Sequence, residues 1–179
     1  MDIQDEKDLA EEILDAITII CPHTILAGGA PRDWYMGNTC NDFDFYFSLD
    51  PDSTMTSNTE QLSRILPKGM VRVKDLEVRS DIMYKHMKDL RRIHYYTYKG
   101  REVQLIQLDR LKSVFNAVDN MSCSICKVWW KGKEVVPTKD FLLSYKTGIM
   151  YLNKDYSWSD PHPKKMRERF PDFSCGTVE

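Results

Sequence analysis

The segment from Asp42 to Phe47 alternates strictly between phenylalanine and a second kind of side chain. Because successive side chains of a β-strand point to opposite faces, the three phenylalanines would share one face, and Asp42, Asp44 and Tyr46 would share the other. Burying the phenylalanine face removes apolar surface from water, so that face belongs to a core. The chain is therefore expected to build a sheet with an apolar core on one side of this strand and a pair of carboxylates on the other.

The size and composition of the chain limit its domain number and its setting. Its 179 residues are 42% hydrophobic, which is enough for one core and too few for two comfortable domains. We expect one domain over residues 1–179, with a less regular segment from about 150 to 179. The five cysteines are odd in number and scattered, no signal peptide is recognisable, and no apolar run approaches the roughly 20 residues of a membrane span. These features predict a soluble cytoplasmic protein without a membrane partner.

Charge is unevenly distributed, although the formal net charge is −2. Residues 1–15 hold seven acidic residues and one lysine, whereas residues 85–112 hold eight Lys or Arg and three acidic residues. Four more basic residues cluster further on, namely Lys164, Lys165, Arg167 and Arg169. Such clusters suit phosphate groups, but a solvated surface is the commoner meaning of a charge run, so the motifs must decide.

The order of helical and strand patterns indicates the fold class. Apolar residues at helical spacing predict a helix over residues 5–20, and a short apolar run at 24–27 leads through a glycine turn to a helical segment at 31–36. Further along, the predicted elements are a loop at 50–58, helices at 59–66, 110–117 and 137–146, and strands at 70–78, 93–98, 102–108, 121–130 and 134–136. This order predicts an α+β fold with a mixed, mostly antiparallel sheet and helices on one side.

The stretch from Ala27 to Tyr46 holds the residue types that nucleotidyl transfer requires. Asp42 and Asp44 can bracket divalent cations, and hard oxygen ligands of this kind suit Mg²⁺. Two such ions, about 3.5–4 Å apart, can activate an attacking hydroxyl and stabilise leaving pyrophosphate. The Gly28-Gly29 pair lets the backbone approach phosphate oxygens, and Arg32 supplies a forked cationic donor. A lone Asp-x-Asp or Gly-Gly is usually a loop or a turn, but here both occur in order within 17 residues.

These residues resemble a known signature. Gly28-Gly29-Ala30-Pro31-Arg32-Asp33, Gly37 and Asp42-Phe43-Asp44 are similar to the GG-x-x-RD…G…D-x-D pattern of tRNA nucleotidyltransferases and bacterial poly(A) polymerases, members of the DNA polymerase β superfamily. The resemblance implies a polymerase β-like nucleotidyltransferase fold in which Asp42 and Asp44 are catalytic metal ligands. It also implies that Gly28, Gly29 and Arg32 bind the triphosphate, and that Asp33 braces the arginine or the glycine turn. The tRNA enzymes continue into helical domains that select the base and grip tRNA, so addition of CCA is not expected here.

Two further positions are predicted from shorter patterns. The segment Val118-Asp119-Asn120-Met121-Ser122-Cys123 stands where the family carries Asp-Phe-Thr and resembles the version in small stand-alone phage enzymes. The resemblance implies a nucleotide-binding role for Asp119, although Asn120 and Met121 depart from the pattern. Polymerase β-like sites often hold a third carboxylate on a neighbouring strand, and Glu102 is the catalytic candidate. Gln104 shares its face and is one alternative, and an exposed position of Glu102 beside the hairpin is the other.

Cys123 and Cys126 have the spacing of half a zinc site, but no second pair accompanies them. On a strand, residues three apart point to opposite faces, so we expect buried structural cysteines instead of a metal site.

Together these patterns predict a magnesium-dependent nucleotidyltransferase. It would move a nucleoside monophosphate from a nucleoside triphosphate to an acceptor hydroxyl of RNA, tRNA or protein and release pyrophosphate. The acceptor, the base and the oligomeric state stay open. The alternatives are a catalytically idle module that senses a nucleotide or binds a partner, and a nucleic-acid-binding protein that uses the basic stretch at 85–112.

Overall fold

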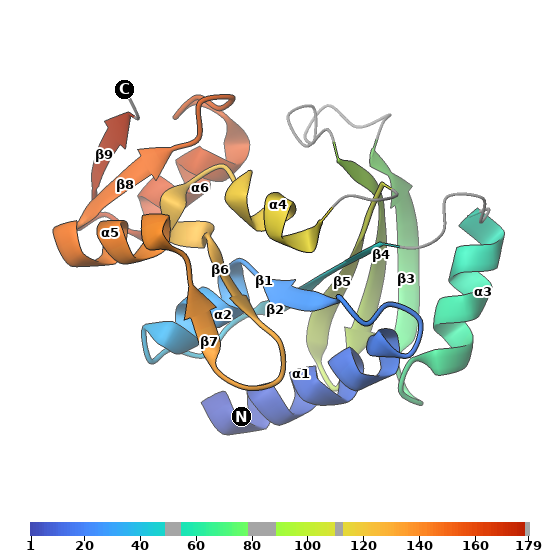
Figure 1. The fold of residues 1–179 in the computed structure, drawn as a ribbon. Coiled ribbons are helices and arrows are strands. Elements are labelled where there is room, and N and C mark those ends of the chain that lie inside the picture. Colours follow the sequence, from blue (N-terminus) through green and yellow to red (C-terminus); the bar gives the residue numbers. More distant parts are fainter. Residues whose placement is uncertain (49–54, 79–88, 110–112, 178–179) are drawn as a thin grey trace.

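The computed structural model describes residues 1–48, 55–78, 89–109 and 113–177, with side chains from residue 58 onward in the second range (Figure 1). Most of the predicted loop at 50–58 lies outside the described residues. The same holds for the start of the predicted helix at 110–117 and for part of the basic stretch at 85–112.

The described elements follow the predicted order closely. In chain order, the helices are α1 (Ile3–Thr18), α2 (Gly29–Tyr35), α3 (Met55–Ile65), α4 (Val114–Asp119), the 3₁₀ helix η3 (Ser124–Cys126), α5 (Lys139–Thr147) and α6 (Pro161–Arg169). The strands are β1 (Ile25–Ala27), β2 (Asp42–Ser48), β3 (Val71–Glu77), β4 (Leu90–Tyr98), β5 (Arg101–Leu108), β6 (Val128–Trp130), β7 (Val135–Pro137), β8 (Ile149–Leu152) and β9 (Ser174–Thr177). This mixture of helices and strands confirms the predicted α+β class.

A seven-stranded sheet organises the molecule, in the order β3-β4-β5-β2-β1-β6-β7. Neighbouring strands run antiparallel except for β2 and β5, which are parallel. The hairpin of β4 and β5 turns at Lys99 and Gly100, both of which have positive φ, as tight hairpin turns demand. The mostly antiparallel sheet and the hairpin position are therefore as predicted, and β2 lies in the middle of the sheet.

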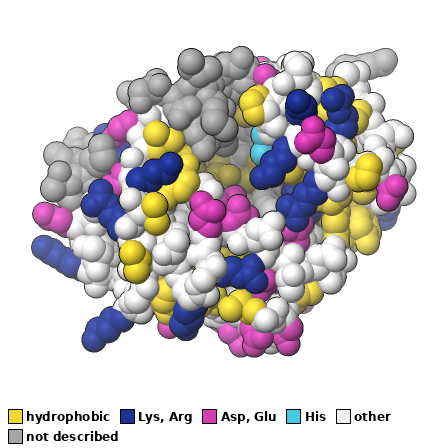
Figure 2. Space-filling view, turned by 180° about the vertical axis from the view of Figure 1, so that it is seen from behind, with side chains coloured by type: hydrophobic (Ala, Val, Ile, Leu, Met, Phe, Trp, Pro, Cys, Tyr) yellow, Lys and Arg dark blue, Asp and Glu magenta, His cyan; other side chains and the backbone are white. Residues whose placement is uncertain are grey.

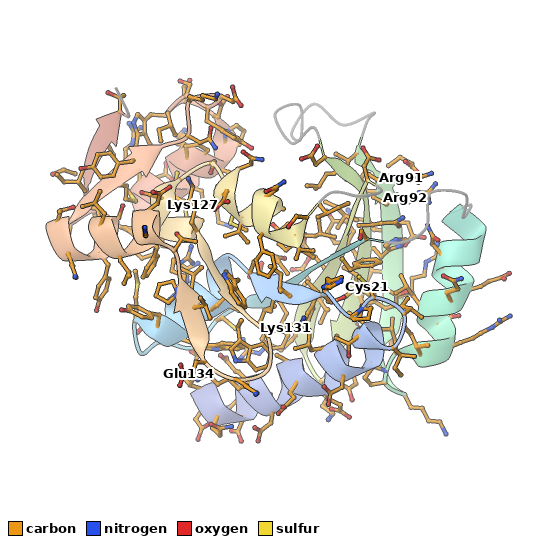
Figure 3. The ribbon with its side chains drawn as sticks, in the orientation of Figure 1. Cys21, Arg91, Arg92, Lys127, Lys131 and Glu134 are labelled. Carbon is orange, nitrogen blue, oxygen red and sulfur yellow. The ribbon has the colours of Figure 1, made fainter. Side chains whose placement is uncertain are left out.

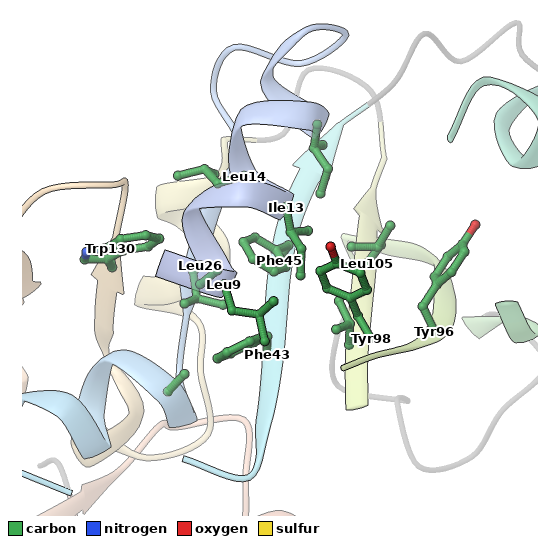
Figure 4. Packing of buried hydrophobic residues seen from close by; sticks show 14 of the residues in the cluster. Leu9, Ile13, Leu14, Leu26, Phe43, Phe45, Tyr96, Tyr98, Leu105 and Trp130 are labelled. Atoms are coloured by element: carbon green, nitrogen blue, oxygen red, sulfur yellow. The ribbon is translucent and has the colours of Figure 1, made fainter. Parts of the chain in front are cut away.

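Helices cover both faces of the sheet, whereas the sequence predicted one covered face (Figure 1). On the first face, the three phenylalanines of β2 belong to one buried cluster with Leu9 and Ile13 of α1 and Leu62 of α3. Figure 4 shows Phe43 and Phe45 beside Leu9 and Ile13. On the second face, a separate cluster contains Val118 of α4, Phe141 of α5 and Met166 of α6. The second layer exists because β1 is buried on both faces, so its apolar side chains need a cover on either side.

A buried carboxylate joins three parts of the first layer. Glu6 of α1 is fully buried and accepts hydrogen bonds from Nε1 of Trp34 at 2.8 Å and from the backbone amide of Cys40 at 3.0 Å. Its other oxygen pairs with the guanidinium of Arg101 at the start of β5. Because Cys40 lies two residues before Asp42, this network holds the start of β2 beside the start of β5.

Two segments differ from the sequence-based expectation. The predicted strand at 121–130 shortens to β6 because residues 124–126 form a 3₁₀ turn, in which the Ser124 hydroxyl contacts the Ser144 hydroxyl and the Tyr151 amide. Every residue from 121 to 126 is buried, and an all-buried turn has the same apolar pattern as a buried strand. The last residues, expected to be less regular, contain β8, α6 and β9.

Candidate active site

The parallel pairing of β2 and β5 brings the predicted acidic residues together. Asp42 stands opposite Glu102, and Asp44 stands opposite Gln104. Neighbouring strands lie about 4.8 Å apart, and side chains in the same row project from the same face. Both candidates for the position of the third carboxylate are therefore adjacent to the aspartates, with Glu102 beside Asp42 and Gln104 beside Asp44. Glu102 is exposed and Gln104 is half-buried.

The carboxylate of Asp44 is buried beside other acidic side chains. Its Oδ1 is buried and has no hydrogen-bond partner among the described residues. The pKa of its carboxyl is raised to about 8, first by burial and then by the negative charges of Asp42 and Glu102, while Lys165 and Arg32 act in the opposite direction. A buried charge is costly unless an opposite charge compensates it, so this carboxylate is suited to holding a cation.

The glycine turn lies against the aspartates. Gly28 precedes α2 with φ of 83°, a conformation that favours glycine because it lacks Cβ. A Cβ on Gly29 would lie 3.8 Å from Oδ1 of Asp42 and 3.7 Å from Nη2 of Arg32. The turn therefore brings backbone, carboxylate and guanidinium to one point.

Arg32 is buried in a network that fixes its direction. Its side chain is 2% exposed, and its Nε donates to Oδ1 of Asp33 at 2.9 Å. Its Nη1 donates to the sulfur atoms of Met166 at 3.3 Å and Cys126 at 3.8 Å. Burial acts to lower the pKa of Arg32, but its contacts with the Cys126 sulfur and the Asp33 carboxylate outweigh this effect, so the pKa is raised overall. With these two donors occupied, Nη2 is the end of the guanidinium that faces the glycine turn.

Helix α6 supplies contacts that the sequence analysis did not assign. Nη2 of Arg169 donates to Oδ2 of Asp33 at 2.7 Å, so that Asp33 lies between two guanidiniums. The ring of Phe170, which follows α6, lies 5.0 Å from the guanidinium carbon of Arg32. The signal that could have revealed this helix is the spacing of Met166 and Phe170, two apolar residues four positions apart within a basic cluster.

The predicted nucleotide-binding residue Asp119 is the last residue of α4 and is exposed. Two positions later, the Met121 side chain ends 3.7 Å from where a Cβ on Gly28 would lie. The Asp119 segment therefore passes beside the glycine turn, but no described contact joins the Asp119 carboxylate to the aspartates or to Arg32.

The carboxylate oxygens of Asp42 and Asp44 suit a cation whose other ligands come from substrate phosphates and water. Within the described ranges, no group of three or more His, Cys, Asp and Glu side chains could hold a metal ion by itself. However, Mg²⁺ at nucleotide sites is usually held by one or two carboxylates together with substrate phosphates and water. Asp42 and Asp44, with the unpartnered oxygen of Asp44, fit a Mg²⁺ ion that arrives with a nucleotide.

Figure 2 shows acidic side chains in the middle of one face of the molecule, with Lys and Arg side chains to either side. Part of the basic stretch that the sequence singled out has other tasks. Arg92, labelled at the start of β4 in Figure 3, is buried and pairs with Glu77 of β3. Arg101 pairs with the buried carboxylate of α1. These two cations are ion-pair partners within the fold, so charge counting overstates the basic surface available to nucleic acid.

Residues 4–148 match the sequence profile of Gad2, described as a Gabija anti-defense 2 family protein. The chain belongs to the Gad2 family. A search of curated proteins finds no match for this Gad2 family member.

Solved structures of CCA-adding enzymes resemble this Gad2 family member in fold. A tRNA-processing enzyme in an apo form matches with a TM-score of 0.62 at 12% identity, over 96% of this chain and 44% of that one. The Thermotoga maritima CCA-adding enzyme complexed with tRNA gives 0.56 at 16% identity, over 96% and 38%. The Bacillus stearothermophilus enzyme in complex with CTP gives 0.55 at 15% identity, over 92% and 40%. The chain spans less than half the length of these enzymes, and the likeness establishes a nucleotidyltransferase-type fold.

Among the described residues, none of the helices has both the length and the apolar character needed to cross a membrane.

Proposed function

We propose that this Gad2 family member is a magnesium-dependent nucleotidyltransferase. It moves a nucleoside monophosphate from a nucleoside triphosphate to an acceptor hydroxyl on RNA or protein. The observation that carries the proposal is the unpartnered, buried oxygen of Asp44 beside Asp42, in register with Glu102 and next to a glycine turn. Neighbouring carboxylates repel each other, and the cations that a metal-bound triphosphate brings would relieve this repulsion.

Each group has a task in this reaction. Asp42 and Asp44 would hold Mg²⁺, which supplies electrostatic stabilisation of the phosphate oxygens when bound. The Gly28-Gly29 turn receives the triphosphate close to the backbone, and Nη2 of Arg32 faces the same point. The acceptor oxygen bonds to the α-phosphorus, the bond from that phosphorus to the bridging oxygen breaks, and pyrophosphate leaves. The hydroxyl proton passes to water.

The acceptor is proposed from the family description. Because that description names Gabija anti-defense, an acceptor that belongs to a Gabija defence system fits the proposal. CTP, ATP and tRNA accompany the CCA-adding enzymes of similar fold, which supports a nucleoside triphosphate as donor and keeps RNA among the acceptors. Fold similarity does not choose between RNA and protein.

The idle-module alternative has one observation in its favour. No set of three metal-ligating side chains is assembled in the described ranges, so a nucleotide could be bound and sensed without being turned over. The presence of two intact aspartates beside the glycine turn favours the enzyme, because a sensor has no need for paired carboxylates that repel each other and a triphosphate.

The experiment supplies each α-³²P nucleoside triphosphate with Mg²⁺ to the purified protein, together with total RNA or protein from cells that carry a Gabija system. Products are treated with ribonuclease or protease before electrophoresis, which separates the acceptor classes. Asp42→Asn and Asp44→Asn are the test variants, and Asp15→Asn on the exposed side of α1 is the matched control. Label that persists in the control and disappears in both test variants supports transfer. Nucleotide binding without label in any acceptor favours the idle module.

A further inference from the structure

Helix α6 lies outside residues 4–148, the part of the chain that the family profile matches, yet it contacts the candidate site at three points. Near its start, Nδ1 of His162 lies 2.6 Å from the hydroxyl of Ser122, next to the methionine that borders the glycine turn. In its middle, Met166 contacts the guanidinium of Arg32. At its end, Arg169 binds Asp33. The helix therefore lies along the site with one face turned toward it.

The angular positions on α6 identify which other side chains share that face. At about 100° per residue, His162, Met166 and Arg169 fall within a narrow arc. Lys165 lies three positions after His162 and four before Arg169, which places it on the edge of the same arc. Lys164 falls on the opposite side of the helix and is exposed.

Lys165 differs from the other cation on this face in having no ion-pair partner among the described residues. No described carboxylate lies within salt-bridge distance of its ammonium, in contrast to Arg169, which is engaged by Asp33. The ammonium of Lys165 is exposed, lies at the edge of the helix face that contacts Arg32 and Asp33, and is engaged by no described acidic residue. It is therefore placed to meet an anion bound at the glycine turn.

We propose that Lys165 is a phosphate ligand of this site, binding the β- and γ-phosphates of the nucleoside triphosphate, and that α6 completes the binding site. This inference rests on the proposed function for the presence of the triphosphate. The side chain suits the task because an ammonium is a compact charge with three donors, and the lysine of other phosphate sites serves in the same manner.

The test measures binding of each of the four ribonucleoside triphosphates, and of the corresponding monophosphates, by titration calorimetry with Mg²⁺. Lys165→Gln is expected to weaken triphosphate binding about 10-fold to 100-fold, the range for a hydrogen bond between charged groups. Monophosphate binding should not change, because a monophosphate lacks the β- and γ-phosphates. Lys165→Arg should keep most of the affinity, and Lys164→Gln should bind as the unchanged protein does.

Several outcomes overturn the inference and are distinguishable from failure of the proposed function. Equal triphosphate affinity for Lys165→Gln and the unchanged protein excludes Lys165 as a ligand. Equal weakening of triphosphate and monophosphate, with a lower melting temperature, assigns Lys165 a structural role instead. Absence of triphosphate binding by the unchanged protein overturns both proposals. A further result is that Lys165→Gln loses triphosphate binding selectively while the unchanged protein transfers no nucleotide to any acceptor. That result supports Lys165 as a phosphate ligand and contradicts the proposed nucleotidyltransferase activity.

Discussion

Arg169 of α6 donates a hydrogen bond of 2.7 Å to Asp33 of α2, although 136 positions separate them in the sequence. The same carboxylate accepts a bond from Arg32, which reaches the glycine turn. Asp33 therefore couples the C-terminal helix to the turn that we assign to the triphosphate. The role that the resemblance implied for Asp33, to brace the arginine or the glycine turn, stays a prediction.

The two sides of this coupling should differ in their effect on stability. Asp33→Ala leaves the guanidinium of Arg32 buried without a carboxylate, and we expect a loss of about 3 kcal/mol in the free energy of unfolding. Arg169→Ala removes a partner that is 36% exposed, so the expected loss is about 1 kcal/mol or less. Urea denaturation of both variants makes the comparison. Equal losses in the free energy of unfolding would show that the buried guanidinium of Arg32 does not depend on the Asp33 carboxylate.

The buried carboxylate of α1 provides a second stability prediction. Glu6→Ala leaves Arg101 without its partner and removes the acceptor of two further donors, so we expect a loss of about 3 kcal/mol. Glu12→Ala on the same helix is the matched control, because its pair with Lys99 is exposed and screened by solvent, so the expected loss is much smaller. Chemical denaturation measures both. A small effect of Glu6→Ala would contradict the network.

The raised pKa of Asp44 predicts how stability depends on pH in the absence of metal. The native pKa is about 8 and the ordinary value is 3.8, so the native protein holds an additional proton between these limits. Stability should therefore fall as the pH rises from about 4 to 8, by up to about 1.4 kcal/mol per pH unit. Asp44→Asn should remove this fall and stabilise the metal-free protein at pH 8, and Asp15→Asn should not. Denaturation in a chelator across this range tests it. Equal slopes for all three proteins would refute it.

The backbone of the glycine turn yields a fourth prediction. Gly148 has left-handed helical backbone angles (φ 68°, ψ 23°), where Ala should cost about 1 kcal/mol of stability. Gly28 (φ 83°, ψ −121°) lies outside that region, so Ala should cost more there. Gly148 ends α5, and a Cβ added there would meet no described atom within 4 Å, so Gly148→Ala serves as the control. Triphosphate binding measured by calorimetry should weaken in Gly28→Ala and stay unchanged in Gly148→Ala. Equal triphosphate affinities of the two variants would show that the glycine turn does not bind the nucleotide.

The sequence predicted those features that local periodicity determines. The alternation from Asp42 to Phe47 placed both carboxylates on one face because a strand has a period of two and nothing in β2 interrupts it. The adjacency of Glu102 to Asp42 was a hypothesis, because strand order cannot be obtained from periodicity, and the parallel register provides it. The roles of these residues in catalysis stay predictions.

Features that depend on long-range packing were missed for physical reasons. Glu6 had the pattern of a solvated acidic helix, and its burial depends on Trp34, Cys40 and Arg101, which are far from it in the sequence. The basic residues of α6 have the pattern of a solvated surface, and the sequence could not show the ion pair of Arg169 because its partner lies far away along the chain. The 3₁₀ turn before β6 was assigned to a strand because all its residues are buried.

The central claim is that the reaction breaks the bond between the α- and β-phosphates. The most direct measurement supplies the same nucleoside triphosphate labelled with ³²P at either the α- or the γ-position, with Mg²⁺ and Gabija-carrying cell extract. The account predicts label in the acceptor from the α-position alone, label in free pyrophosphate from the γ-position, and loss of both in Asp42→Asn. Label in the acceptor from the γ-position would indicate phosphoryl transfer and contradict the account, as would turnover that persists in Asp42→Asn.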